Sequence, residues 1–467
     1  MTTGASGSLA PDFSRKVHVV GGGLAGLSAA LALTEAGCKV TLHESGPVAG
    51  GRCRSYFDRD LGIRVDNGNH LLLSGNRAAF AYIDTIGARD TLTGPAEPLF
   101  PFIDLQTGVR WMLRPSRGRI PWWVLRRSRR VPGTRITDYL ALRRLARITS
   151  DATVARSLRK DTLYSHLAVP LAIAALNTQP EEALARHFGT VLRETILAGG
   201  KACIPSFPRE GLSESLIDPA VAWLRRRGAT LNLSSRVTAL TIAGDRVTAL
   251  QTAEGPEPVE AVVLAVPPWV ATTLVPGLTA PTAFEAIVNV HFAVTAAPGP
   301  AGFIGLIGGT AEWLFVKRDH VSVTISAANR LVDLPAEELA ARVWPDVQAA
   351  LDLTWPLAAP ATRPLGPGPS RPIPPGASAA GLLATLESSE AATHSSDASS
   401  PMPPWRVVKE KRATFAATAE QERLRPGPRV GLGNLAVAGD WTATGLPATI
   451  EGAIRSGRRA AEAILAA

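Results

Sequence analysis

Short β-branched runs and longer segments with helical spacing alternate along this chain, and the clearest example lies near its start. The run Val17–Val20 predicts a buried strand, because β-branched side chains favour extended backbone. The segment Leu24–Ala36 is apolar at helical spacing and ends at Gly37, and Lys39–His43 then alternates as a second strand. The pattern predicts a β-α-β unit with parallel strands.

The rest of the chain carries both patterns in a less regular order. Alternating segments predict strands at 239–242, 247–252, 261–266, 287–292, 313–317 and 321–326, and helical spacing predicts helices at 137–148, 161–176, 212–227 and 335–351. At 467 residues the chain is too long for one compact core. We therefore expect two or three domains.

A glycine turn joins the first strand to the first helix. Gly21, Gly23 and Gly26 have the spacing G-x-G-x-x-G, in which the glycines allow a sharp turn, close approach of a phosphate and tight helix–strand packing. The N–H groups at the helix start, from Leu24 and Ala25, point toward an anion. The sequence predicts dinucleotide binding here, and the alternative is a tight turn without a ligand.

An acidic residue and a second glycine turn follow. Glu44 closes the second strand 18 residues after Gly26, where its carboxylate can accept hydrogen bonds from both ribose hydroxyls and disfavours a 2′-phosphate. Gly50, Gly51 and Arg52 then place a guanidinium where it can hold phosphate oxygens. Read alone, the second turn is equally compatible with a plain loop.

Composition describes a globular and rather apolar protein, with 46% hydrophobic and 19% charged residues. The three cysteines, Cys38, Cys53 and Cys203, form no C-x-x-C pair, so neither a disulfide framework nor a metal site is expected, and a reducing cytosol fits. Residues 1–14 do not resemble a signal peptide, and no run of 18 apolar residues predicts a membrane span.

Positive charge is concentrated in one window, residues 110–147, with twelve arginines and one acid, or +11 against +9 for the whole chain. Trp111, Trp122 and Trp123 lie in the same window. Arginine mixed with tryptophan favours a surface that binds anionic lipid headgroups, which predicts a cytoplasmic protein held peripherally on the inner face of the membrane. A solvated basic loop is the alternative, and nucleic acid is disfavoured because no nucleic-acid module is present.

The C-terminal part carries a second set of cofactor signals. A predicted strand ends at Gly439 and Asp440, whose carboxylate can hydrogen-bond ribityl or pyrophosphate-side hydroxyls. Thr449 opens a helix whose positive end would stabilise a reduced, anionic flavin. Together with the first glycine turn, these signals favour FAD over NAD.

The motifs GGGLAG, Glu44, GGRCRS and DNGNH together resemble the FAD-binding N-terminus of the flavin amine oxidase and phytoene desaturase superfamily. The resemblance implies an α/β fold class: a glutathione-reductase-like Rossmann FAD-binding domain and a mixed sheet-and-helix substrate domain. It also implies FAD contacts from further positions, namely Gly68, Asn69, His70, Val237 and Ile450.

The resemblance divides the chain into two discontinuous domains. Residues 15–90, 205–268 and 405–467 are expected to bind FAD, and residues 91–204 and 269–355 to form the substrate and membrane-facing domain. Residues 356–404 are rich in Pro, Ala, Ser and Gly with few large apolar groups, so we predict a disordered insertion there.

Several segments resemble a narrower family, the squalene-associated FAD-dependent hydroxysqualene dehydroxylases of hopanoid synthesis. These segments are DNGNHLLL, AALNTQPEEA, VLRETI, IVNVHF, VVKEKRATFAAT and AGDWTATGLPATIEGA. The resemblance implies reductive removal of an allylic hydroxyl from hydroxysqualene, with FAD reduced by NAD(P)H. A carotenoid-type desaturase, an amine oxidase and a flavin-binding protein without turnover are the alternatives.

A thirty-carbon polyene would need a long apolar tunnel, and its hydroxide leaving group would need a proton donor or a polarising group. His70 is the leading candidate because it follows the DNG turn, which the resemblance puts beside the flavin ring, although it could equally serve to orient that turn. Glu194 and Lys409 are further candidates for polar groups in an otherwise apolar pocket.

Overall fold

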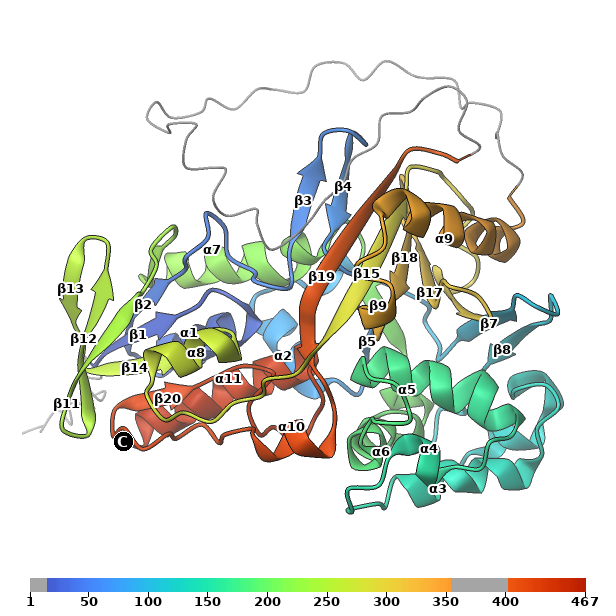
Figure 1. The fold of residues 1–467 in the computed structure, drawn as a ribbon, viewed down its shortest axis with the longest axis horizontal. Helices are drawn as coiled ribbons and strands as arrows, with labels where there is room; N and C mark the ends of the chain where they lie inside the picture. The colour runs from blue at the N-terminus through green and yellow to red at the C-terminus, as the bar shows by residue number, and fades with distance from the viewer. Residues whose placement is uncertain (1–14, 354–401) are drawn as a thin grey trace, which may run out of the picture.

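The computed structural model describes residues 15–353 and 402–467. One half of the molecule is built on a five-stranded parallel sheet (Figure 1) in the order β10-β2-β1-β14-β20. The strands are β1 (Lys16–Val20), β2 (Lys39–His43), β10 (Thr230–Asn232), β14 (Ala261–Leu264) and β20 (Leu435–Val437). The predicted β-α-β unit is confirmed, with β14 inserted between β1 and the C-terminal strand β20.

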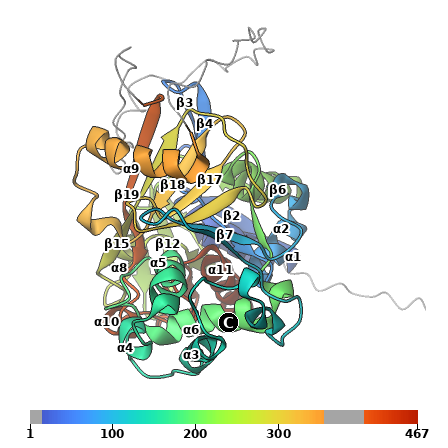
Figure 2. The ribbon, with the colours of Figure 1, turned by 90° about the vertical axis from the view of Figure 1, so that its right-hand side faces the viewer.

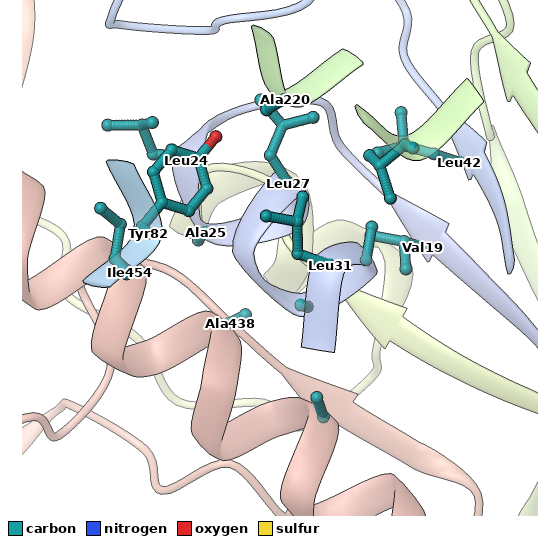
Figure 3. Packing of buried hydrophobic residues seen from close by; sticks show 14 of the residues in the cluster. Val19, Leu24, Ala25, Leu27, Leu31, Leu42, Tyr82, Ala220, Ala438 and Ile454 are labelled. Carbon is teal, nitrogen blue, oxygen red and sulfur yellow. The ribbon is translucent and has the colours of Figure 1, made fainter. Parts of the chain in front are cut away.

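Two helices from opposite ends of the chain pack on each other over this sheet. They are α1 (Leu24–Glu35) and α11 (Ile450–Leu465). At Gly457 of α11 an added Cβ would lie 2.1 Å from the Ala25 carbonyl oxygen, so only glycine allows this approach. The Ser28 hydroxyl donates to the Ile454 carbonyl oxygen at 2.9 Å. Figure 3 shows Ile454 beside the α1 residues of this core.

Further elements surround the parallel sheet. The helices are α2 (Arg77–Thr85), α7 (Asp218–Arg226) and α8 (Pro268–Leu274). Helix α7 continues a short π-helix at Ser213–Ile217. The small sheets are β3 (Ser55–Asp58) with β4 (Ile63–Asp66); β5 (Leu72–Leu73), β9 (Pro205–Pro208) and β6 (Leu92–Thr93); and β11 (Ala239–Ala243), β12 (Arg246–Thr252) and β13 (Gly255–Pro258). Figure 1 shows the last of these at one end of the molecule.

A seven-stranded mixed sheet forms the second half, in the order β19-β15-β18-β17-β16-β7-β8. Its strands are β7 (Phe100–Asp104), β8 (Arg110–Leu113), β15 (Phe284–Phe292), β16 (Phe303–Ile307), β17 (Trp313–Val316), β18 (Val321–Ile325) and β19 (Trp405–Phe415). Strand β19, which begins at the expected domain boundary at 405, pairs with β15 and does not join the parallel sheet. Strand pattern alone does not identify the partner strand.

Helices cover both sides of this sheet. On one side α9 (Ala336–Leu351) packs on the buried valines of β15 and β18. Four helices lie below the sheet in Figure 2: α3 (Leu140–Leu145), α4 (Val154–Ser157), α5 (Val169–Leu176) and α6 (Ala185–Glu194). Helix α5 continues a short π-helix at Tyr164–Ala168. The short helix α10 (Ala419–Arg423) follows β19.

Among the described residues, no helix has the length and apolar character needed to cross a bilayer. The predicted disordered insertion at 356–404 lies outside the described residues except for its last three positions.

Candidate cofactor and active site

The first glycine turn has the geometry that a pyrophosphate requires. Gly21 has φ +109°, and an added Cβ would meet the Ala265 carbonyl oxygen at 2.3 Å. At Gly26 a Cβ would lie 1.9 Å from the Gly21 carbonyl oxygen, so helix and turn touch. At Gly23 a Cβ would meet nothing within 4 Å, and no side chain caps α1. The turn therefore leaves space and the N–H groups around Leu24 for an anion.

Glu44 is held in place by the backbone around it. Its carboxylate oxygens accept hydrogen bonds from the Gly22 and Gly46 N–H groups, each at 2.7 Å. Because both bonds fix the carboxylate at the end of β2, the acid is oriented before any ribose binds. This geometry fits the predicted role of Glu44.

The second glycine turn and the C-terminal strand meet the first turn. The Gly50 N–H donates to the Gly22 carbonyl oxygen at 2.9 Å, and an added Cβ at Gly51 would lie 3.4 Å from the Gly23 Cα. Next to Gly51, the Arg52 guanidinium binds the Asp440 carboxylate at 2.5 Å. The structure thus brings the predicted N-terminal and C-terminal cofactor residues together across the sheet.

Val237 lies close to the predicted adenosine end of the site. It is buried, and two residues before it the Ser235 N–H donates to the Glu44 carbonyl oxygen at 2.8 Å. Within residues 15–353 and 402–467, the Val237 main-chain N–H and C=O form no hydrogen bond. They are available for the edge of an adenine, as the resemblance implies.

The start of α11 offers a second anion-binding end. Thr449 is its N-cap, and its hydroxyl accepts from the Gly452 N–H at 3.0 Å. Ile450 begins the helix and is buried, while the Gly439 N–H donates to the Ser456 hydroxyl at 2.9 Å. The first-turn N–H groups of α11 can therefore stabilise negative charge on a bound group.

The DNGNH turn rests against one face of the seven-stranded sheet. The Asn69 side-chain amide donates to Ser322 Oγ at 2.7 Å and Thr324 Oγ1 at 3.0 Å. Asn289 Nδ2 donates to the Asn67 carbonyl oxygen at 3.1 Å, and an added Cβ at Gly68 would lie 3.5 Å from the same nitrogen. Sequence reasoning missed Asn289, because strand register rather than local pattern brings it to the turn.

His70 follows this turn and is partly buried. Burial, the largest cause, lowers the pKa of His70 to about 4, with Asp66 opposing and Arg52 and Lys317 adding to the shift. The imidazole is therefore neutral at pH 7. Its N–H can donate a hydrogen bond, but the ring is not a charged imidazolium that could act as a general acid.

Lys317 is a buried cation beside the same turn that sequence reasoning did not identify. Its Nζ donates to the Pro208 carbonyl oxygen at 2.9 Å and lies 3.7 Å from the Asp66 carboxylate. Burial lowers the pKa of Lys317, and the charge of Asp66 opposes that shift. A single lysine at the end of a strand gives no sequence signal of such a position.

The other two proposed polar groups lie elsewhere. Lys409 is opposite Val288 on the sheet face that packs on α9, and its Nζ donates to the Leu334 carbonyl oxygen at 2.6 Å. Glu194 at the end of α6 forms a bidentate pair with Arg455 of α11, at 2.6 and 3.0 Å. Neither side chain is gathered with the DNGNH turn, because each is committed to a structural contact.

A cluster rich in aromatic side chains lies between the seven-stranded sheet and the helices α3, α5 and α6. Buried members include Phe100, Phe102, Phe207, Phe303, Trp313 and Phe315. Cross-strand pairing puts Trp313 on the same sheet face as Thr324 and Asn289, the face that meets the DNGNH turn. The polar groups that meet the turn therefore share a sheet face with an aromatic cluster, while a tunnel for a thirty-carbon chain stays a prediction.

Comparison with known proteins agrees with this architecture. The family model described as "Flavin containing amine oxidoreductase" matches residues 24–298 and 318–465. Among solved structures, cyclohexylamine oxidase from Brevibacterium oxydans has a similar fold, with a TM-score of 0.62 at 16% identity over 97% of this chain and 99% of that one.

Two curated relatives are similar over almost the whole chain. One, from Rhodopseudomonas palustris, is 46% identical over 461 residues, covering 97% of this chain and 99% of the relative. The other, from Sinorhizobium fredii, is 43% identical over 457 residues, covering 97% and 98%. Both are named hydroxysqualene dehydroxylase. This chain therefore belongs to the hydroxysqualene dehydroxylase family within the flavin-containing amine oxidoreductases.

Proposed function

We propose that this protein converts hydroxysqualene to squalene by reductive removal of the allylic hydroxyl, in hopanoid biosynthesis, with FAD as cofactor. The observation that carries the proposal is the near full-length similarity to hydroxysqualene dehydroxylases. The convergence of Gly23, Glu44, Arg52 and Asp440 supports FAD, because these groups match its phosphate and ribose chemistry.

The reaction replaces a C–OH bond with a C–H bond. A hydride forms the new bond while hydroxide leaves and takes up a proton to become water, so the net input is two electrons and two protons. FAD, when bound and reduced, would supply the hydride. NADH or NADPH is the proposed source of its electrons.

Residues beside the DNGNH turn are proposed to assist the leaving hydroxyl. His70, neutral at pH 7 with a pKa of about 4, would act as a hydrogen-bond donor to the leaving oxygen. Lys317 is the second candidate, because it is a buried ammonium on the same side of the sheet. Glu194 and Lys409 are left out of this proposal, since both are held in structural contacts.

We also propose that the arginine-rich window docks the protein on an anionic membrane, which would deliver the lipid-soluble substrate. Trp122 is 62% exposed, whereas Trp111 and Trp123 are 8% and 3% exposed and belong to the core. The exposed apolar set in and beside this window also includes Val109, Ile120, Leu125, Ile136 and Leu140. Exposed apolar side chains among arginines fit insertion at a headgroup surface.

Product analysis tests the reaction. The purified protein, reduced anaerobically, is incubated with hydroxysqualene, and mass spectrometry should find squalene. An aerobic incubation with phytoene tests the desaturase alternative, in which the flavin is reduced by the polyene. Squalene without desaturated phytoene supports the proposal, and desaturated phytoene without squalene contradicts it. A bound flavin that reacts with neither would favour a binding protein without turnover.

A further inference from the structure

A compact group of metal-ligating side chains lies away from the reactive end of the site. His18 Nδ1 and His43 Nε2 are 3.1 Å apart. The Glu257 carboxylate oxygens lie 3.7 Å from the first nitrogen and 3.6 Å from the second. All three ligand atoms fall within 4.8 Å of one another. From this geometry we propose that these three side chains bind one divalent transition-metal ion of the zinc class.

The fold brings the three residues together from distant parts of the chain. His18 on β1 is opposite Thr41 of β2, and His43 two residues later shares that sheet face. Glu257 on β13 reaches the same pair from the three-stranded sheet β11–β13. The arrangement therefore joins two sheets. No short sequence motif indicates it, because the three residues are far apart in the chain. The expectation of no metal site considered the cysteines alone.

The distances fit a metal site as well as a hydrogen bond between the two imidazoles, whose nearly parallel rings have centroids 5.4 Å apart. A tetrahedral ion with ligand bonds of about 2.0–2.1 Å separates neighbouring ligand atoms by about 3.3 Å. One N–H shared between the imidazoles would satisfy the 3.1 Å contact. It would leave the Glu257 oxygens 3.6 and 3.7 Å from the two nitrogens, beyond hydrogen-bond range. A cation bound by both imidazoles would draw the Glu257 carboxylate in as the third ligand.

The surroundings fit a metal ligand set. The two histidines are buried, while the Glu257 side chain is 38% exposed and leaves an entry path from solvent. Burial, the largest cause, lowers the pKa of both His18 and His43, and the charge of Glu257 opposes that shift. Ser235 Oγ lies 3.2 Å from His43 Nδ1, where it can accept that N–H while Nε2 binds the ion.

The ion would fasten the backbone that carries the ribose acid. The His43 carbonyl oxygen accepts the Gly21 N–H at 2.8 Å, and Glu44 follows His43 directly. The proposed role is structural, because the three ligands come from β1, β2 and β13 and the ion would hold these strands together. It does not depend on the reaction proposed above.

The test uses untagged, FAD-loaded protein freed of metal with a chelator and then titrated with Zn²⁺ alone. About one zinc per chain should bind, and Tm should rise by about 2–4 °C. Glu257→Gln should weaken zinc binding at least tenfold, as should His43→Gln. Glu254→Gln, an equal charge change in the turn before β13, should bind zinc as the unchanged protein does.

Co²⁺ provides an independent readout, because a tetrahedral cobalt site absorbs visible light and should lose that band in Glu257→Gln. No zinc bound to the unchanged protein would overturn the proposal. Zinc bound equally well by Glu257→Gln, His43→Gln and Glu254→Gln would also overturn it, since the ion would then be held elsewhere.

Discussion

The dinucleotide end of the cofactor site and its reactive end are assembled in different ways. At the dinucleotide end, Gly21, Gly26 and Glu44 are positioned by backbone contacts within one β-α-β unit. At the reactive end, Asn69 of the turn meets Thr324 of β18 and, through it, Asn289 of β15 by side-chain hydrogen bonds. The first end is a local structure, and the second depends on the register of the seven-stranded sheet.

The largest expected effect tests the local end. Gly23→Ala should reduce FAD affinity at least 100-fold while leaving the thermal unfolding of the apoprotein unchanged, because its new Cβ meets no protein atom within 4 Å and fills space meant for phosphate. Flavin retained after gel filtration and Tm of the apoprotein are the measurements. Gly427→Ala, also without neighbours within 4 Å, is the matched control and should change neither. Normal FAD affinity in Gly23→Ala would contradict the assigned phosphate position.

The next effect tests the link between the two ends of the chain. Asp440→Asn removes the charge that binds Arg52 at 2.5 Å and should weaken FAD binding by roughly 10–100-fold, since both groups are expected to contact the cofactor. Isothermal titration of the apoprotein with FAD measures this. Asp333→Asn, which loses only an exposed pair with Lys411, should bind FAD normally. Equal affinities for the two variants would remove Asp440 from the site.

A smaller effect is expected at the reactive end. Asn69→Ala loses two side-chain hydrogen bonds to the sheet and should lower turnover about tenfold with FAD affinity nearly unchanged, because the turn is less well positioned. Squalene formation at saturating substrate measures turnover. Asn329→Ala also loses hydrogen bonds to the sheet, at the Ala286 N–H and the Phe284 carbonyl oxygen, but not at the turn. Turnover that falls equally in both variants would indicate a general loss of rigidity.

The smallest effect concerns the membrane surface. Trp122→Ser should weaken binding to anionic liposomes severalfold, and neutralising the arginines at 126, 127 and 129 should remove most of its salt dependence. Liposome sedimentation at low and high salt measures both. Phe57→Ser is the control, because Phe57 is 59% exposed but lies outside the arginine-rich window. Binding that is unchanged in all variants would contradict membrane docking.

The same contrast explains what the sequence could predict. The residues from Gly21 to Arg52 could be identified because turn chemistry requires particular residue types at fixed spacing. Asn289 and Lys317 could not, because their proximity to the DNGNH turn follows from strand pairing over more than 200 positions. The arginine-rich window was only partly interpretable, since nothing in its sequence separates the buried Trp111 and Trp123 from the exposed Trp122.

The close fit of Gly457 against Ala25 has a consequence for how the protein is made. Strand β20 begins 415 residues after β1 ends. During synthesis, β20 and α11 therefore leave the ribosome long after β1 and α1. The nascent chain must hold the apolar face of α1 uncovered until α11 emerges. Flavin can therefore be captured firmly only after α11 has left the ribosome.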